Sequence, residues 1–105
     1  MTNNFAKKVL SLKNSIDYQE NSIVSKTITT NENSSLTLFA FDKGQSIAAH
    51  SAPVDAVVQS IEGEVEIVIS GEKFNLSEGD IILMPKGEPH SLDAKTKFKM
   101  ALFKV

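Results

Sequence analysis

From residue 22 onward the chain alternates apolar and polar positions with a period of two, the pattern of half-buried β-strands. Turn sequences such as Ser70-Gly71-Glu72 and Ser77-Glu78-Gly79 separate these segments. Strands are expected at 23–30, 36–42, 55–61, 64–70, 74–76, 80–84 and 98–105. With these seven among roughly eight or nine short strands in all, and without a convincing long helix, the pattern predicts an all-β fold, either an antiparallel sandwich or a small barrel.

The first part of the chain does not follow this pattern. Phe5, Val9, Leu12 and Ile16 have helical spacing, yet residues 8–12 also resemble a short extended piece. We therefore expect residues 1–21 to form a loosely structured arm with at most one helical turn. Residues 22–105 are expected to form one domain, because a chain of 105 residues has room for no more.

The segment 55–61 is apolar on both of its faces. If it is a strand, one face carries Ala56, Val58 and Ser60, and the other carries Val57, Gln59 and Ile61. One face can line the interior, whereas the other must be covered by the N-terminal arm or by a second subunit. A homodimer is the expected cover, because a chain this small buries little core on its own.

Composition excludes several classes of function. The 11 basic residues are all lysines and are balanced by 13 acidic residues, so no basic excess points to nucleic acid. Cysteine is absent, which excludes thiolate metal sites, disulfides and cysteine nucleophiles. No apolar run has the length of a signal peptide or a membrane span, and we expect a cytoplasmic protein without a membrane partner. Lys95, Lys97 and Lys99 alternate near the last strand, where they are expected to keep a sheet edge solvated.

Glycine and histidine recur at a spacing that resembles the cupin family. Gly44, His50 and Gly63 fit the frame of the first cupin motif, which is G, five residues, H-x-H, three or four residues, E, six residues and G. Residues 79–90 fit the second motif through Gly79, the Pro85-Lys86-Gly87 turn and His90. The resemblance implies a small antiparallel jelly-roll barrel over residues 22–105.

Cupins hold one divalent metal with the two histidines and the glutamate of motif one and the histidine of motif two. In this chain His50 and His90 match the first and last of these ligands, whereas Ala52 and Ala56 stand at the other two positions. Metal sites of enzymes normally use three or more protein ligands. The resemblance thus implies a divalent transition metal at His50 and His90, but the two alanines argue against tight binding. A third ligand would have to come from Asp55, Gln59, Glu88 or Ser51.

The same residues predict a pocket in the mouth of the barrel. Replacing a histidine and a glutamate by alanine enlarges the cavity and leaves it apolar with a few polar points, which is typical of a small-molecule site. The predicted lining is His50, Ala52, Ala56, Val58, Leu83, Met84 and His90.

Three functions remain open at this stage. The first is binding of a small polar molecule, such as a sugar or an organic acid, without a strong metal site. The second is a metal-dependent enzyme of the dioxygenase or isomerase type, with His50, His90, water and substrate as ligands. The third is a structural or sensing dimeric module. No catalytic residue can be assigned from the sequence.

Overall fold

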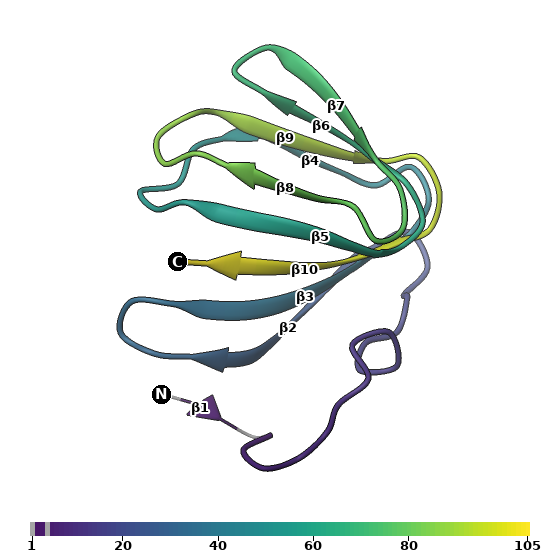
Figure 1. Ribbon diagram of the computed structural model, residues 1–105. Coiled ribbons are helices and arrows are strands. Elements are labelled where there is room, and N and C mark those ends of the chain that lie inside the picture. Colours follow the sequence, from purple (N-terminus) through teal and green to yellow (C-terminus); the bar gives the residue numbers. More distant parts are fainter. Residues whose placement is uncertain (1, 4) are drawn as a thin grey trace.

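The computed structural model describes residues 2–3 and 5–105, and within this part of the chain all regular structure is β-strand. Figure 1 shows the strands stacked in two sheets, with the N-terminal segment running outside them. The strands are β1 (Thr2–Asn3), β2 (Ile23–Thr30), β3 (Ser35–Phe41), β4 (Ser46–His50), β5 (Ala56–Glu62), β6 (Val65–Ile69), β7 (Glu72–Leu76), β8 (Ile81–Met84), β9 (His90–Ala94) and β10 (Phe98–Lys104). The all-β prediction is confirmed.

The strands form two antiparallel sheets. One sheet has the order β1-β2-β3-β10-β5-β8, and the other has the order β4-β9-β6-β7. Some neighbours are consecutive in the sequence, such as β2 with β3 and β6 with β7, whereas others come from distant parts of it, as in the pairing of β10 with both β3 and β5. This connectivity is that of a jelly roll, in which two sheets close around one interior.

The interior between the sheets is apolar. Strand alternation directs every second side chain inward, so that β5 buries Ala56, Val58 and Ser60 and β6 buries its own alternate residues. The core cluster comprises Phe41, Ala56, Val58, Val65, Ile67, Ile69, Leu76, Met84, Leu92, Ala94, Phe98 and Met100. It fills the space between the two sheets, and four of its members, Ala56, Met84, Leu92 and Met100, also reach the open mouth of the barrel.

The N-terminal segment covers part of the outer face of the six-stranded sheet. Ile16 is buried there against Leu38, Ala40 and Ala101, and Ile61 packs against the same cluster. The hydroxyl of Tyr18 donates a hydrogen bond of 2.6 Å to Glu62 Oε2 on β5. The buried side chain of Ile16 and the hydrogen bond of Tyr18 thus attach the segment to the sheet. Within its described residues the segment forms turns and no helix.

The expectation that Lys99 is solvated is wrong. Its side chain is buried beneath the N-terminal segment, where its ammonium donates to the carbonyl of Lys13 at 2.7 Å. The ammonium also lies 5.0 Å from the centre of the Tyr18 ring. The lysines do alternate near the start of β10, but the N-terminal arm covers this face of the strand at Lys99. A carbonyl and an aromatic face replace water there.

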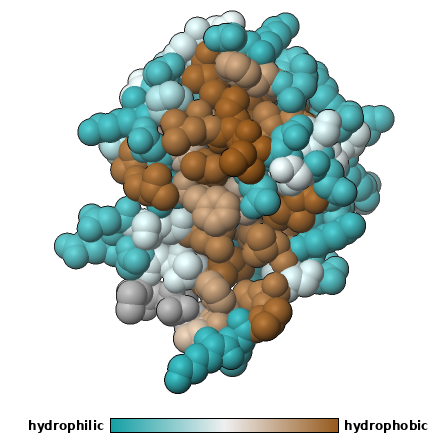
Figure 2. All heavy atoms as spheres, viewed as in Figure 1, coloured by the Kyte–Doolittle hydropathy of each residue, from teal (hydrophilic) through white to brown (hydrophobic). Residues whose placement is uncertain are grey.

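The rest of the outer face remains open. On β8, Ile81 and Leu83 are 65% and 49% exposed, and Leu83 pairs with Val57 of β5. Figure 2 shows hydrophobic residues gathered in the middle of the face on which β5 and β8 lie. Of the outward-facing apolar residues of 55–61, only Ile61 packs against the cluster that the N-terminal arm covers.

Gly63 occupies a turn that only glycine fits. Its φ is +82°, and a Cβ placed on it would overlap the carbonyl oxygen of Lys97. The turn brings β5 into β6 against the segment that enters β10, so the glycine of the first motif has a packing role here.

No helix in the described part of the chain is long and apolar enough to cross a membrane.

Candidate functional site

The open mouth of the barrel is framed by two rows of paired residues. In the four-stranded sheet, His50 of β4 pairs with His90 of β9, and His90 pairs with Ile69 of β6. In the six-stranded sheet, Ala56 of β5 pairs with Met84 of β8 and with Lys104 of β10. Because both rows belong to strands that turn their alternate residues inward, they bound one pocket.

This pocket has a volume of about 400 Å³. Its walls are mostly apolar and interrupted by a few polar groups, the usual character of a small-molecule site. Its lining consists of Phe39, Ile47, His50, Ser51, Ala52, Pro53, Ala56, Met84, His90, Leu92, Met100, Leu102 and Lys104.

The two histidines touch each other edge to face. Their ring centroids are 4.5 Å apart and their planes are inclined by 65°. His50 Nδ1 lies 3.1 Å from the carbonyl oxygen of Ala48, and His90 Nδ1 lies 3.3 Å from that of Glu88. A carbonyl oxygen can only accept, so in a neutral ring the proton sits on Nδ1. Each Nε2 then carries a lone pair.

The environment of His90 keeps its ring neutral. Burial lowers the pKa of His90 below its usual value, and electrostatic interactions with His50 and Lys104 lower it further. The hydrogen bond to the carbonyl of Glu88 opposes these effects in part. His90 is 4% exposed, whereas His50 lies at the exposed rim of the mouth.

Five of the seven residues predicted for the pocket come together around it: His50, Ala52, Ala56, Met84 and His90. The two alanines at the cupin ligand positions both line the cavity, in keeping with the expectation that small side chains there leave space. The two histidines belong to different motifs and are 40 residues apart in the sequence, and the pairing of β4 with β9 brings them into contact.

Two predicted lining residues lie elsewhere. Leu83 points to the outside of the barrel, because its neighbour Met84 takes the inward position on β8. It borders a separate hollow with Phe74, Ile82 and Pro85. Val58 is fully buried one inward position deeper than Ala56 and supports the pocket without lining it.

Several lining residues were not predicted. Phe39 and Leu102 fall in predicted strands and Leu92 falls in none, and the sequence pattern does not indicate which end of the barrel any of them reaches. Lys104 was missed although a signal existed: it continues the inward alternation of Met100 and Leu102. Period two along the last strand was sufficient to place its side chain at the mouth.

The donor set present does not fit a metal site of three or more protein ligands. The described residues contain no group of three or more histidine, aspartate, glutamate or cysteine side chains that could hold an ion. Asp55 instead accepts a hydrogen bond from the backbone N–H of Lys86 at 2.7 Å, and Glu88 accepts one from Ser70 at 2.9 Å. Gln59 lies on the opposite face of β5 from Ala56, and only Ser51 of the considered third ligands lines the pocket.

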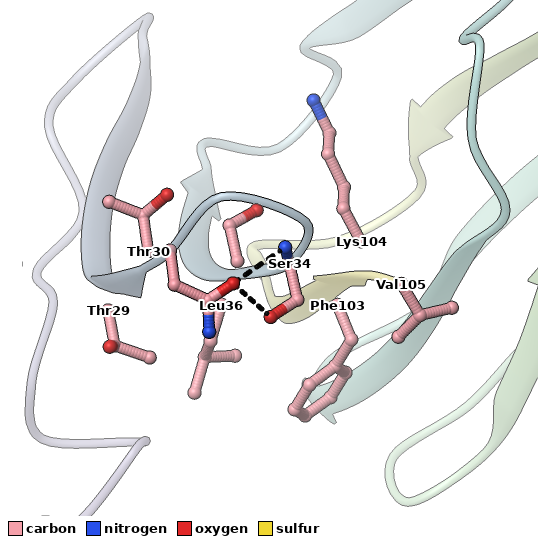
Figure 3. Close-up of a pocket in the computed structure, with 9 residues that line it drawn as sticks. Thr29, Thr30, Ser34, Leu36, Phe103, Lys104 and Val105 are labelled. Atoms are coloured by element: carbon pink, nitrogen blue, oxygen red, sulfur yellow. Dashed lines mark hydrogen bonds between the residues drawn. The ribbon is translucent and has the colours of Figure 1, made fainter. Parts of the chain in front are cut away.

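A second hollow, near the C-terminus, is formed by a hairpin turn and not by the barrel mouth. Figure 3 shows it between the β2–β3 hairpin and the end of β10. Asn31 Oδ1 accepts hydrogen bonds there from the backbone N–H groups of Asn33 and Ser34 and from the Ser34 hydroxyl. These groups are used by the hairpin turn itself, so the hollow is a consequence of the turn.

Two antiparallel sheets around an apolar interior, with paired histidines at one mouth, define a small jelly-roll barrel of the cupin type. The sequence profile of the cupin domain matches residues 37–105, and the chain therefore belongs to the cupin family. The resemblance inferred from the two motifs is confirmed. No curated protein matches the sequence with significance.

Solved structures support the same assignment. A conserved protein of unknown function from Streptococcus pyogenes is 39% identical with a TM-score of 0.88, covering 93% of this chain and 86% of that one. A cupin 2 conserved barrel domain protein from Leptotrichia buccalis is 36% identical with a TM-score of 0.88, covering 91% of this chain and 47% of that one. A cupin superfamily protein from Desulfitobacterium hafniense, at 24% identity and a TM-score of 0.82, covers 86% of this chain and 83% of that one, and it shows the fold alone.

Proposed function

We propose that this cupin binds a small polar molecule in the pocket at the barrel mouth, without a tightly bound metal. The observation that carries the proposal is the convergence of His50, His90, Ala52 and Ala56 on one cavity of about 400 Å³. A cavity of this size is large enough for a small metabolite. The histidines supply polar contacts, while the alanines leave the space that a histidine and a glutamate would occupy.

The histidines are suited to this role because their outer nitrogens are available. Within residues 2–3 and 5–105, no protein hydrogen bond reaches Nε2 of His50 or His90. A ligand hydroxyl or N–H group that donates to these atoms would replace water without breaking an existing contact.

The test is a thermal-shift screen of the purified protein against a panel of monosaccharides and small organic acids. Ala52→Leu fills the pocket from a half-buried loop position, and Ala6→Leu places the same side chain on an exposed position of the N-terminal segment outside the pocket. Compounds that stabilise wild type and the Ala6→Leu variant should lose their effect on Ala52→Leu. Stabilisation that persists in Ala52→Leu would place binding elsewhere, and a panel without any active compound would contradict small-molecule binding.

A metal-dependent dioxygenase or isomerase is the alternative, because two imidazole nitrogens converge on the pocket. It would require ligands beyond the protein, since the donor set stops at two histidines. Metal analysis of protein purified after growth with iron, manganese, zinc, nickel and copper separates the two proposals. Near-stoichiometric metal that is lost in a His50→Ala variant would favour the enzyme.

We further expect the protein to act as a homodimer in the cytoplasm, with the open part of the outer sheet face as its interface. A purely structural or sensing dimer would differ from the binding proposal in one respect. Replacing both histidines would then leave its fold, its association and any cellular role unchanged.

A further inference from the structure

A lysine lies at the exposed rim of the pocket, at the end of the last strand, where it also borders the hollows beside the β2–β3 hairpin. Phe98, Met100 and Leu102 of β10 turn inward to the core, and Lys104 has the same parity. Figure 3 shows Lys104 and its neighbour Phe103 extending in opposite directions. Phe103 packs with the outer cluster under the N-terminal arm, whereas Lys104 lines the pocket that contains both histidines.

The ammonium of Lys104 has no partner among the residues that the structure describes. Among residues 2–3 and 5–105 it forms neither a salt bridge nor a side-chain hydrogen bond; the ion pairs there are Lys13–Glu62 and Lys95–Asp93. No aspartate or glutamate lines the pocket. Asp55 and Glu88 are hydrogen-bonded to groups outside it, and Glu32, which borders a neighbouring hollow together with Lys104, forms no ion pair with it. The pocket thus presents one uncompensated positive charge at its mouth, which favours an anion.

The charge of Lys104 acts on the same space as the histidines. Lys104 pairs with Ala56, one of the two alanines that line the cavity. Its charge also contributes to the lowered pKa of His90, which means that the ammonium and the imidazole share one electrostatic environment. A ligand in the pocket therefore meets a cationic donor from one sheet and two imidazoles from the other.

The imidazoles call for a hydrogen-bond donor on the ligand. Their Nδ1 atoms face backbone carbonyls, so a ring in its neutral form offers an Nε2 lone pair to the pocket. A ligand hydroxyl can donate to these acceptors, whereas a carboxylate cannot. The remaining walls, formed by Phe39, Leu92 and Leu102, suit an apolar body rather than a molecule covered with hydroxyl groups.

Building on the proposed function, we propose that the ligand is a small hydroxy carboxylate with an apolar body. Its carboxylate binds the ammonium of Lys104, and its hydroxyl donates to Nε2 of His90 or His50. Its apolar part packs against Phe39 and Leu102. Charge, hydrogen-bond direction and wall chemistry each select one part of this ligand class.

The experiment uses matched sets of probes in isothermal titration calorimetry at pH 7.5. Lactate, 2-hydroxy-4-methylpentanoate and mandelate are each compared with the acid that lacks the hydroxyl and with the methyl ester that lacks the charge. We expect at least one hydroxy acid to bind at concentrations up to about 10 mM. Removing its hydroxyl or its charge should weaken binding about tenfold each, as expected for the loss of one hydrogen bond, in the second case to a charged group.

Lys104→Met tests the residue that carries the inference. It should weaken binding of the hydroxy acid about tenfold and remove the preference for the acid over the ester. Lys73→Met is the matched control, since Lys73 is exposed on β7 and does not line the pocket. Its affinities should equal those of wild type. A thermal unfolding curve for each variant shows that the barrel remains folded.

Other results overturn the inference in distinguishable ways. Binding of neutral sugars that is blocked in Ala52→Leu but indifferent to Lys104→Met would reject the hydroxy carboxylate and leave the binding function standing. An equal affinity for acid and ester would do the same. No binding by any hydroxy acid would reject the ligand class, and failure of the wider screen as well would reject the binding function with it.

Discussion

His50 and His90 lie directly opposite each other on β4 and β9, with their rings in edge-to-face contact at a centroid separation of 4.5 Å. The Nδ1 atom of each ring contacts a backbone carbonyl, that of Ala48 for His50 and that of Glu88 for His90. The Nε2 atom on the other side of each ring is left for the pocket. The backbone therefore orients both rings without a carboxylate. The pair offers two adjacent acceptors to a ligand, and the chain adds no third metal-binding side chain among the described residues.

The lowered pKa of His90 predicts how stability depends on pH. The unfolded chain binds a proton at this histidine near pH 6.5, whereas the folded protein resists it until a lower pH. Stability from this group is complete above about pH 6.5 and is lost as the pH falls toward the folded-state pKa. Urea unfolding between pH 8 and about pH 5 should show the free energy of unfolding decreasing over this range.

The His90→Gln variant is the control for this prediction. It removes the titrating group but retains a polar side chain of similar reach, so the free energy of unfolding should vary less with pH between 6.5 and 5. If wild type becomes more stable on acidification, His90 is not held neutral. If both proteins show the same slope, the pH dependence arises elsewhere.

The two alanines predict a gain of metal binding. In the double variant Ala52→His with Ala56→Glu, both new side chains enter the pocket that contains His50 and His90. The site would then have four ligands, a number typical of cupins and of transition-metal sites in general. Affinity for Co²⁺ or Zn²⁺ should rise by about 100-fold or more over wild type, measured by calorimetry or by cobalt absorption.

Adding His50→Ala to the double variant should remove most of the gained affinity, since it deletes one of the four ligands. Circular dichroism and thermal unfolding establish first that the double variant is folded, because Ala56 is buried and glutamate there must be accommodated. A folded double variant with no gain in affinity would mean that Ala52 and Ala56 do not occupy the ligand positions.

Gly63 predicts a large effect of a single methyl group. Gly63→Ala would force a left-handed backbone and place a Cβ against the carbonyl of Lys97, so it should lower the free energy of unfolding by about 3 kcal/mol or more. Gly71 has a similar φ of +83° but open space around its Cβ position. Gly71→Ala should therefore cost only about 1 kcal/mol of backbone strain. Equal losses in urea unfolding would show that the contact with Lys97 is unimportant.

The barrel and the histidine pair could be predicted from the sequence to different depths. Residues 23–30 were placed correctly as β2, because β-branched residues and a polar turn mark both its nature and its end. Strand β4 was not predicted, because its sequence SIAAH is largely exposed and has little alternation. The contact of His50 with His90 depends on the pairing of β4 with β9 across a register shift, which local patterns do not encode.

Strand parity explains both the failure at Leu83 and the omission of Lys104. Leu83 and Met84 are neighbours, so only one of them can face the interior, and the pairing of Met84 with Ala56 selects Met84. Lys104 follows Met100 and Leu102 at the same parity, and its position could have been inferred from that pattern. A charged residue at the end of a strand is usually solvated, and Lys104 is indeed exposed, so its parity alone marks it as part of the pocket.

The uncovered outer face predicts that the protein associates through β8. Ile81 and Leu83 are exposed on β8, and Leu83 pairs with the half-buried Val57 of β5. The arm covers this face only as far as Ile61. A second copy of this chain would present the same apolar strip and bury it symmetrically.

Light scattering after size-exclusion chromatography should give the mass of a dimer for wild type. In Leu83→Lys the dissociation constant should rise about 100-fold, since a charge would enter the centre of the interface. Val9→Lys, which changes a fully exposed apolar residue of the arm, should leave the dimer intact. A monomeric wild type, or a dimer that tolerates Leu83→Lys, would show that this face is not the interface.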